Sequence, residues 1–199
     1  LVALDEIPPS YQFTAGYPDA AQWNEVRLVL LPVGARLDKG DMPPALAEML
    51  YDTLPHELGH DALDRLPQLV QDLDGAVEPG TRWFVEGACE LLAKGFSRVE
   101  APELSRRALA RRKASALAAG ERLAKVLPDW TRNAAADLSL EAGLYGAALL
   151  TLQAWEENTP LAALLSRIKA ATVPVRGAEL AAMLRDTLGV GPGELCGRA

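Results

Sequence analysis

Histidine and cysteine are both scarce in this chain, which contains two of each among its 199 residues. The two cysteines, Cys89 and Cys196, are too few for a disulfide scaffold, and their separation excludes a CxxC zinc or redox pair. The two histidines, His56 and His60, exclude any metal site built from three histidines. No apolar run reaches the roughly 18 residues that a bilayer span needs, so we expect no membrane span.

Basic residues are too few for a nucleic-acid-binding protein. Lys and Arg number 20 against 27 Asp and Glu, which gives a net charge of −7. Because phosphate binding needs a concentrated basic surface, we expect no nucleic-acid partner. The apolar content of 49% and charged content of 24% exclude disorder as the main state. The length predicts a single domain over residues 1–199, whose oligomeric state the sequence leaves open.

Residues 1–40 differ in composition from the rest of the chain. They are rich in Pro, Gly and aromatic residues, and residues 26–31 are the best strand candidate, ended by Pro32. Residues 1–4 are a second candidate strand, so this β-rich part predicts a small sheet. The sequence begins at Leu1 without a methionine, which favours a processed or trimmed chain and an extracytoplasmic over a cytoplasmic location.

Residues 44–199 are rich in Ala and Leu and predict a helical part. Helices are expected over residues 45–54, 82–94, 103–126, 140–156, 160–171 and 178–188. Between the first two, a helix that carries both histidines should end before Pro67, with Pro55 either kinking it or standing in its first turn. Trp130 and Trp155 fall at helical positions and are predicted to lie in the core.

Residues 56–60, His-Glu-Leu-Gly-His, form an HExxH pattern. On a helix, positions i and i+4 lie on one face about one turn apart, so His56 and His60 can both reach one zinc ion with bonds of about 2.0–2.1 Å. Glu57 points about 100° around the helix, beside the expected water on the metal, where its carboxylate can take a proton. Glu57 is therefore predicted to be the general base.

A catalytic zinc site needs a third protein ligand and an open fourth position. Since no third histidine exists, that ligand must be a carboxylate or a cysteine. The best candidate is Glu86, which follows His60 after 25 intervening residues on a separate predicted helix. Gly87 and Ala88 beside it are small, so we expect them to let this helix approach the helix of the histidines.

Three other side chains are weaker candidates for this chemistry. Asp64 shares a helix face with the histidines, but it lies about 12 Å along the helix from His56. Cys89 could ligate zinc as a thiolate, although buried inert cysteines are far commoner, and it could instead pair with Cys196. The basic run of Arg106, Arg107, Arg111, Arg112 and Lys113 is predicted to be a solvated helix face, with a docking patch for an acidic peptide as the alternative.

HELGH at residues 56–60 followed by WFVEGACE at residues 83–90 resembles the gluzincin zinc metallopeptidases, in particular the peptidase MA-like group with HExxH … WxxEGxAE. The resemblance covers residues 50–199 in outline, and only these two motifs are specific. It implies a zincin-like α+β fold that is mostly α-helical, with a small N-terminal β-sheet beside the HExxH helix. Residues 26–31 would then be the edge strand that binds the substrate backbone.

The same resemblance implies a Zn²⁺ cofactor and a peptide or protein substrate. It implies Glu86 as the third zinc ligand and Glu90 as the carboxylate that holds a liganding imidazole by its free N–H, unless Glu90 is a solvated helix residue. The chain lacks the extra histidine that thermolysin-like members use for the oxyanion. Aminopeptidase-like relatives use a tyrosine instead, for which Tyr145 has the most similar context; packing is an equally good explanation of Tyr145.

These patterns together predict a gluzincin-type zinc peptidase. Two alternatives stay open: a catalytically idle zinc-binding module with a regulatory or interaction role, and a regulatory protease of the ImmA/IrrE type. The latter carries its third Glu in an ExxANxFA context, which Glu86 lacks. The intact Glu57 favours an enzyme, since an idle site would not need it. Cleavage preference cannot be predicted from the sequence.

Overall fold

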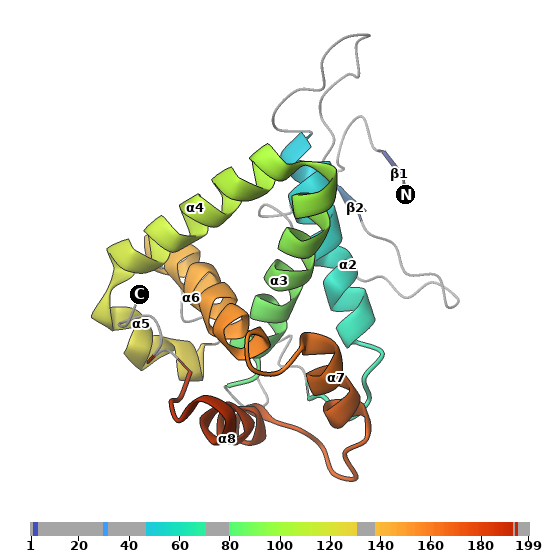
Figure 1. Ribbon diagram of the computed structural model, residues 1–199, viewed down its shortest axis with the longest axis vertical. Helices are drawn as coiled ribbons and strands as arrows, with labels where there is room; N and C mark the ends of the chain where they lie inside the picture. Colours follow the sequence, from blue (N-terminus) through green and yellow to red (C-terminus); the bar gives the residue numbers. More distant parts are fainter. Residues whose placement is uncertain are drawn as a thin grey trace, which may run out of the picture.

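A computed structural model describes residues 2–3, 30–31, 47–70, 80–130, 138–192 and 194 of the chain (Figure 1). Two long helices, α3 (Arg82–Glu100) and α6 (Leu138–Glu156), pack against each other at the centre of this part. The remaining helical elements are η1 (Met49–Thr53), α2 (Leu54–Leu63), α4 (Pro102–Ala119), α5 (Glu121–Val126), η2 (Leu127–Asp129), α7 (Leu161–Lys169) and α8 (Gly177–Leu188).

The prediction of an α+β fold with a small N-terminal sheet beside the HExxH helix is wrong. In the described part of the chain, the strands are β1 (Val2–Ala3) and β2 (Leu30–Leu31), which pair in parallel over two residues each. A single bridge joins Leu69 to Val175. Pairing over two residues makes too few hydrogen bonds to form a sheet that could support a site. Most of the predicted strand 26–31 lies outside the described residues.

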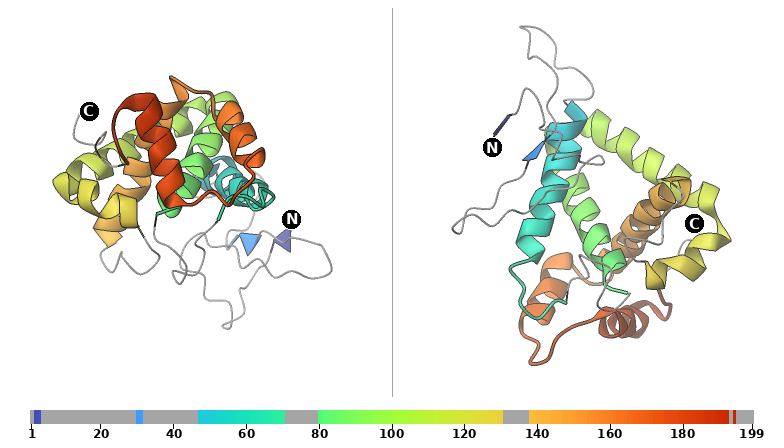
Figure 2. Two further views of the ribbon diagram at one scale, coloured as in Figure 1. Left: turned by 90° about the horizontal axis from the view of Figure 1, so that it is seen from below. Right: turned by 180° about the vertical axis from the view of Figure 1, so that it is seen from behind.

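The helices pack in the order α2, α3, α6, α4, each against the next. Helix α4 also contacts α3. Figure 2 shows the same order from behind, with α7 and α8 beside one end of α3 and α6. Inside this group of helices, the rings of Trp83 and Trp155 lie parallel with centroids 6.3 Å apart, and Phe84 packs edge-on against both. Trp130 and Trp155 are fully buried, which confirms that both belong to the core.

Two glycines show how closely α3 is held between its neighbours. An added Cβ on Gly59 of α2 would lie 3.0 Å from Cys89 Sγ and 3.1 Å from Cys89 Cα, so α2 and α3 touch at this point. An added Cβ on Gly87 of α3 would lie 2.7 Å from the carbonyl oxygen of Ala148 on α6. The expectation that Gly87 brings α3 close to the helix of the histidines is therefore wrong, because Gly87 faces α6 and Gly59 makes the α2 contact.

The segment that leads into the HExxH helix is helical throughout. The π-helical turn η1 ends at Thr53, which is itself in the α-helical conformation, and α2 follows at once with Pro55 as its second residue. A π-helical turn locally widens the helix, so the chain passes Pro55 without a helix break. Helix α2 ends at Leu63, before Pro67, as predicted.

Other helix ends differ from expectation at two glycines. Gly120 adopts φ +55° and ψ −141°, and it divides the single helix predicted over 103–126 into α4 and α5. Gly95 was expected to end α3, but the helix continues to Glu100. No heavy atom would lie within 4 Å of an added Cβ on Gly95, so this glycine serves no close contact.

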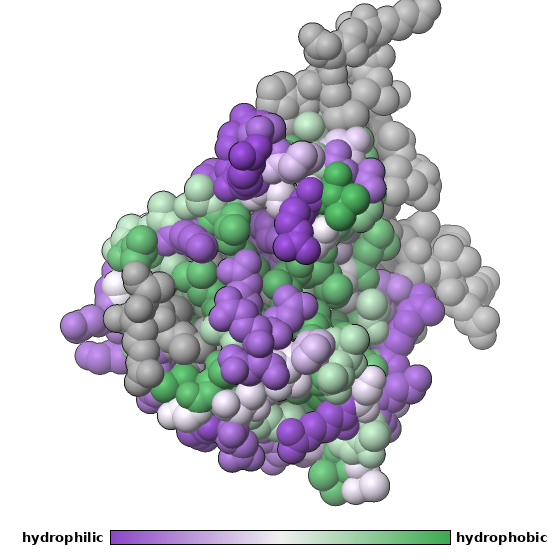
Figure 3. Space-filling model, viewed as in Figure 1, coloured by the Kyte–Doolittle hydropathy of each residue, from purple (hydrophilic) through white to green (hydrophobic). Residues whose placement is uncertain are grey.

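Figure 3 shows hydrophilic and hydrophobic side chains intermixed over the face viewed in Figure 1. Large apolar side chains exposed on α3 include Phe96, whose ring stacks on that of Tyr51 at 6.5 Å, and Val99. Among the described residues, no helix combines the length and the apolar character that crossing a membrane requires.

Candidate metal centre

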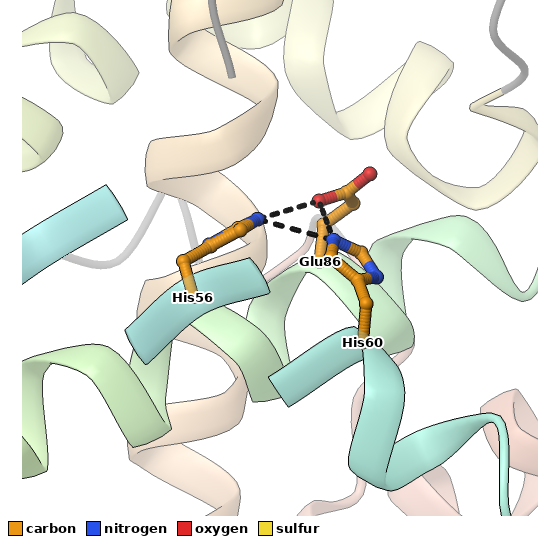
Figure 4. Close-up of side chains that lie close together, drawn as sticks. All are labelled: His56, His60 and Glu86. Atoms are coloured by element: carbon orange, nitrogen blue, oxygen red, sulfur yellow. Dashed lines mark hydrogen bonds and ion pairs between the residues drawn. The ribbon is translucent and has the colours of Figure 1, made fainter. Parts of the chain in front are cut away.

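The side chains of His56, His60 and Glu86 point toward one another from two adjacent helices (Figure 4). The Nε2 atoms of the two histidines lie 3.2 Å apart. Glu86 Oε2 lies 3.3 Å from the Nε2 of His56 and 3.4 Å from that of His60. The i, i+4 spacing on α2 places both imidazoles on one face, and the contact of α2 with α3 brings Glu86 opposite them.

The spacing of these three atoms suits a metal ion. Ligand atoms at about 2.0–2.1 Å from a tetrahedral zinc lie about 3.3 Å from one another, which the three observed distances match. Glu86 Oε2 is buried and makes no hydrogen bond within the described part of the chain, so its lone pairs face the centre of the triangle. Two imidazoles and one carboxylate are also a ligand set that zinc accepts. The three residues therefore fit a zinc ion.

The site can be reached from solvent. The side chain of His56 is 12% exposed to solvent, and that of His60 is 17% exposed. Glu86 lies deeper, and its second oxygen, Oε1, is 3.3 Å from Arg82 Nε. Arg82 is itself buried, with its guanidinium 4.7 Å from the centre of the Trp130 ring. One oxygen of Glu86 is thus held by Arg82, while the other faces the histidines.

Nearby cationic and imidazole groups keep Glu86 and Glu90 ionised. Burial raises the pKa of Glu86, but the close contacts of its carboxylate with His56 and His60 and their charges outweigh it and hold the pKa well below its usual range. Burial likewise raises the pKa of Glu90, but its close contact with His56 and the charges of Arg112 and Lys94 hold the pKa well below its usual range. Burial lowers the pKa of His56, yet the same two carboxylates raise it to about 10.

Glu90 lies behind His56, on the side away from the triangle. Its Oε1 is 3.4 Å from His56 Nδ1, and the residue is only 2% exposed, unlike a solvated helix glutamate. Arg112 of α4 donates from Nε to Glu90 Oε2 at 3.1 Å and from Nη2 to Oε1. Lys94 Nζ lies 3.2 Å from Oε2 and also pairs with Asp52 of η1. Glu90 therefore contacts the imidazole of His56 and is itself held by Arg112 and Lys94.

Glu57 and Tyr145, the two predicted catalytic residues, both lie near the histidines. Glu57 is buried, and its Oε2 has no hydrogen-bond partner among the described residues. Burial raises the pKa of the Glu57 carboxyl to about 7, against the opposing charges of His56 and His60. The ring centroid of Tyr145, on α6, is 6.1 Å from that of His56 and 5.0 Å from that of Trp130.

The weaker ligand candidates lie outside the triangle. Cys89 is a buried free thiol that packs against the backbone of α2 at Gly59, and burial raises its pKa well above the usual value. Asp64 follows the last residue of α2 and is not part of the group that could hold an ion. Cys196 lies outside the described residues.

Sequence reasoning missed the cations that support the two acids. Arg82 precedes Glu86 by four residues and Lys94 follows Glu90 by four, so the i, i+4 spacing on one helix was an available signal. Arg112 gave no such signal. It belongs to the basic run of α4 that was expected to be solvated, and the other members of that run, Arg106, Arg107, Arg111 and Lys113, are indeed exposed.

Comparisons with known proteins add no family. A scan against protein-family models, a search of curated proteins and a search of solved structures each gave no match.

Proposed function

We propose that this chain is a zinc-dependent peptidase of the gluzincin type. The observation that carries the proposal is the triangle of His56 Nε2, His60 Nε2 and Glu86 Oε2, with sides of 3.2–3.4 Å. The two motifs that resemble gluzincins supply these three residues, and the same motifs supply Glu57 as the general base.

The three residues would hold the ion with one nitrogen or oxygen each. A zinc ion bound there supplies Lewis acidity, which lowers the pKa of water towards about 7 and polarises a peptide carbonyl. Because Arg82 already occupies Oε1 of Glu86, this carboxylate offers only Oε2 to the ion. His56 and His60 would bind the ion through unprotonated Nε2 atoms, so ion binding would release any proton on Nε2 of His56, while Glu90 would keep the proton on Nδ1.

Glu57 would move the proton in the reaction. Its carboxylate accepts a proton from the attacking water as the water oxygen adds to the scissile carbonyl carbon. The same carboxyl then gives this proton to the amide nitrogen as the C–N bond breaks, so the products are a carboxylic acid and an amine, which become a carboxylate and an ammonium ion at neutral pH. The Glu57 carboxyl is buried next to His56 on the same helix, a position from which it can accept and release this proton.

Tyr145 is the candidate for stabilising negative charge on the carbonyl oxygen. Its ring centroid lies 6.1 Å from that of His56, and the proposed role requires its phenol to donate a hydrogen bond to the reacting carbonyl oxygen. Substrates would be peptides or proteins, as the resemblance of the two motifs to gluzincins implies.

The alternative of an idle zinc-binding module is less well supported. In such a protein, Glu57 would be a buried carboxylate with an unpartnered oxygen and a raised pKa, which destabilises the fold without contributing to metal binding. In an enzyme, that same environment gives the base its working pKa.

Replacing Glu57 by Gln tests the proposal. The variant keeps the shape of the side chain and removes its charge and basicity, so zinc content should match the wild type and the protein should be at least as stable. Peptide hydrolysis should fall by roughly 10²–10⁴-fold, the range that general bases contribute. A chelator should abolish wild-type cleavage, and added zinc should restore it.

Two results would contradict this account. If the wild type binds one zinc ion tightly but cleaves nothing in a broad peptide library, the idle-module alternative is correct. If Glu57→Gln cleaves peptides as fast as the wild type, the role given to Glu57 is wrong even when the metal site is right.

A further inference from the structure

Helix α4 contributes one side chain to the surroundings of the candidate metal centre. The side chain of Arg112 is 31% exposed, whereas that of its neighbour Arg111 is 60% exposed and pairs with Glu48 at 3.0 Å. Arg112 reaches inward to Glu90 on α3. Neither of the two motifs that resemble gluzincins contains Arg112, so the proposed function assigns it no role.

Arg112 holds both oxygens of Glu90. Its Nε donates to Oε2 at 3.1 Å and its Nη2 donates to Oε1, which is the forked geometry that a guanidinium forms with a carboxylate. Lys94 contacts only Oε2 and shares its charge with Asp52. Of these two cations, only Arg112 fixes the plane of the Glu90 carboxylate.

The plane of Glu90 matters because Oε1 faces Nδ1 of His56 at 3.4 Å. A neutral imidazole carries its proton on one nitrogen, and when an ion takes Nε2, the carboxylate at Nδ1 can accept the remaining N–H. The lone pair is then left on Nε2, the atom of His56 that faces His60 and Glu86. A carboxylate free to rotate would hold the ring less firmly and favour this form less.

Arg112 is also held in place at its backbone and along its side chain. An added Cβ on Gly146 of α6 would lie only 2.1 Å from the carbonyl oxygen of Arg112, so the two backbones are in tight contact. The guanidinium lies 5.2 Å from the centre of the Tyr145 ring, and that ring lies 6.1 Å from His56. Helices α4 and α6 therefore fix Arg112 before any ion binds.

We propose that Arg112 is a positioning residue for zinc binding: its forked contact with Glu90 holds the imidazole of His56 with Nε2 directed at the metal. Arg112 itself touches neither the ion nor a substrate. The inference rests on the proposed zinc site and extends it to α4, which lies outside both motifs.

The experiment compares zinc affinity in three variants with that of the wild type, by competition with a chromogenic chelator. Arg112→Met keeps the apolar stem and removes the fork, and it should weaken zinc binding about 10–100-fold, as loss of such supporting groups does. Arg112→Lys keeps the charge without the fork and should lie between Arg112→Met and the wild type. Arg111→Met is the matched control on the same helix and should bind zinc as the wild type does.

A second readout separates positioning from general loosening of the fold. The chain has two histidines, so a long-range ¹H–¹⁵N spectrum of the zinc-loaded protein contains signals from only two imidazoles. The wild type should show His56 with its proton on Nδ1. Arg112→Met should shift or broaden the His56 signals and leave those of His60 in place.

The outcomes can be told apart. If the wild type binds no zinc, the proposed function fails and the inference falls with it. If the wild type binds zinc and Arg112→Met has the same affinity and the same His56 signals, the inference alone is overturned. If circular dichroism shows that Arg112→Met is unfolded, Arg112→Lys decides, and wild-type affinity in that folded variant overturns the role of the fork.

Discussion

Replacing Gly59 by Ala tests how α2 is held against α3. The new Cβ would lie 3.0 Å from Cys89 Sγ, 3.1 Å from Cys89 Cα and 3.3 Å from Cys89 Cβ. Alanine in a helix interior is favoured over glycine by about 0.8–1.0 kcal/mol, whereas overpacking of a core contact costs about 1–3 kcal/mol. Since one obstacle is a backbone atom that cannot rotate away, we expect a net destabilisation of about 0–2 kcal/mol.

Gly95→Ala is the matched control, because Gly95 is also inside a helix but an added Cβ would meet nothing within 4 Å. This variant should be stabilised by about 0.8–1.0 kcal/mol, so the two variants should differ by about 1–3 kcal/mol in urea unfolding. Gly59→Ala should also bind zinc more weakly, because a shift of α2 relative to α3 displaces its histidines relative to Glu86. If Gly59→Ala is stabilised like Gly95→Ala and keeps wild-type zinc affinity, the α2–α3 contact described here is wrong.

Three further substitutions test other parts of the account. Gly87→Ala places a Cβ 2.7 Å from a carbonyl oxygen of α6 and should destabilise the protein by about 2 kcal/mol in denaturant unfolding, after the helix-propensity gain of alanine is subtracted; unchanged stability would contradict the α3–α6 contact. Tyr145→Phe should lower kcat more than it raises KM if the phenol acts only on the transition state, and equal kinetics would leave Tyr145 as a packing residue. Glu86→Ala should lose zinc in metal analysis while Cys89→Ser keeps it, and the reverse result would mean that the third ligand is misassigned.

The arrangement of the candidate site could be predicted largely from local periodicity. His56 and His60 share a helix face because of their spacing, which does not depend on the rest of the fold. Glu86 could be singled out by the need for a third ligand that is not histidine and by its resemblance to a known motif, but nothing in helical periodicity says that α3 packs on α2. Its approach to within 3.4 Å of both histidines is a property of the packed helices.

The features that the sequence did not predict depend on contacts between segments that are distant along the chain. Gly87 and Gly59 are both small residues in helices, and only the packing decides which of them faces α6 and which faces α3. Arg112 was read as part of a solvated face because its neighbours are basic, yet its fork is directed at Glu90, 22 residues earlier in the chain. The predicted sheet came from apolar, β-branched composition, which does not by itself provide a second strand of sufficient length.

Helix ends could be predicted at residues that lack a backbone N–H donor or that adopt a left-handed backbone conformation. Gly189 adopts φ 70° and ends α8, as expected from its place after the last apolar position. Gly95 and Gly120 show the limit of that reasoning, because the same residue type continues one helix and divides another. The difference lies in the backbone conformation that the surrounding packing imposes, which the identity of the residue does not determine.

The most direct test of the zinc site is anomalous diffraction at the zinc edge from crystals of the chain soaked in zinc. The account predicts one strong peak between Nε2 of His56, Nε2 of His60 and Oε2 of Glu86. A strong peak elsewhere, or no peak among these three atoms at full zinc loading, would contradict it.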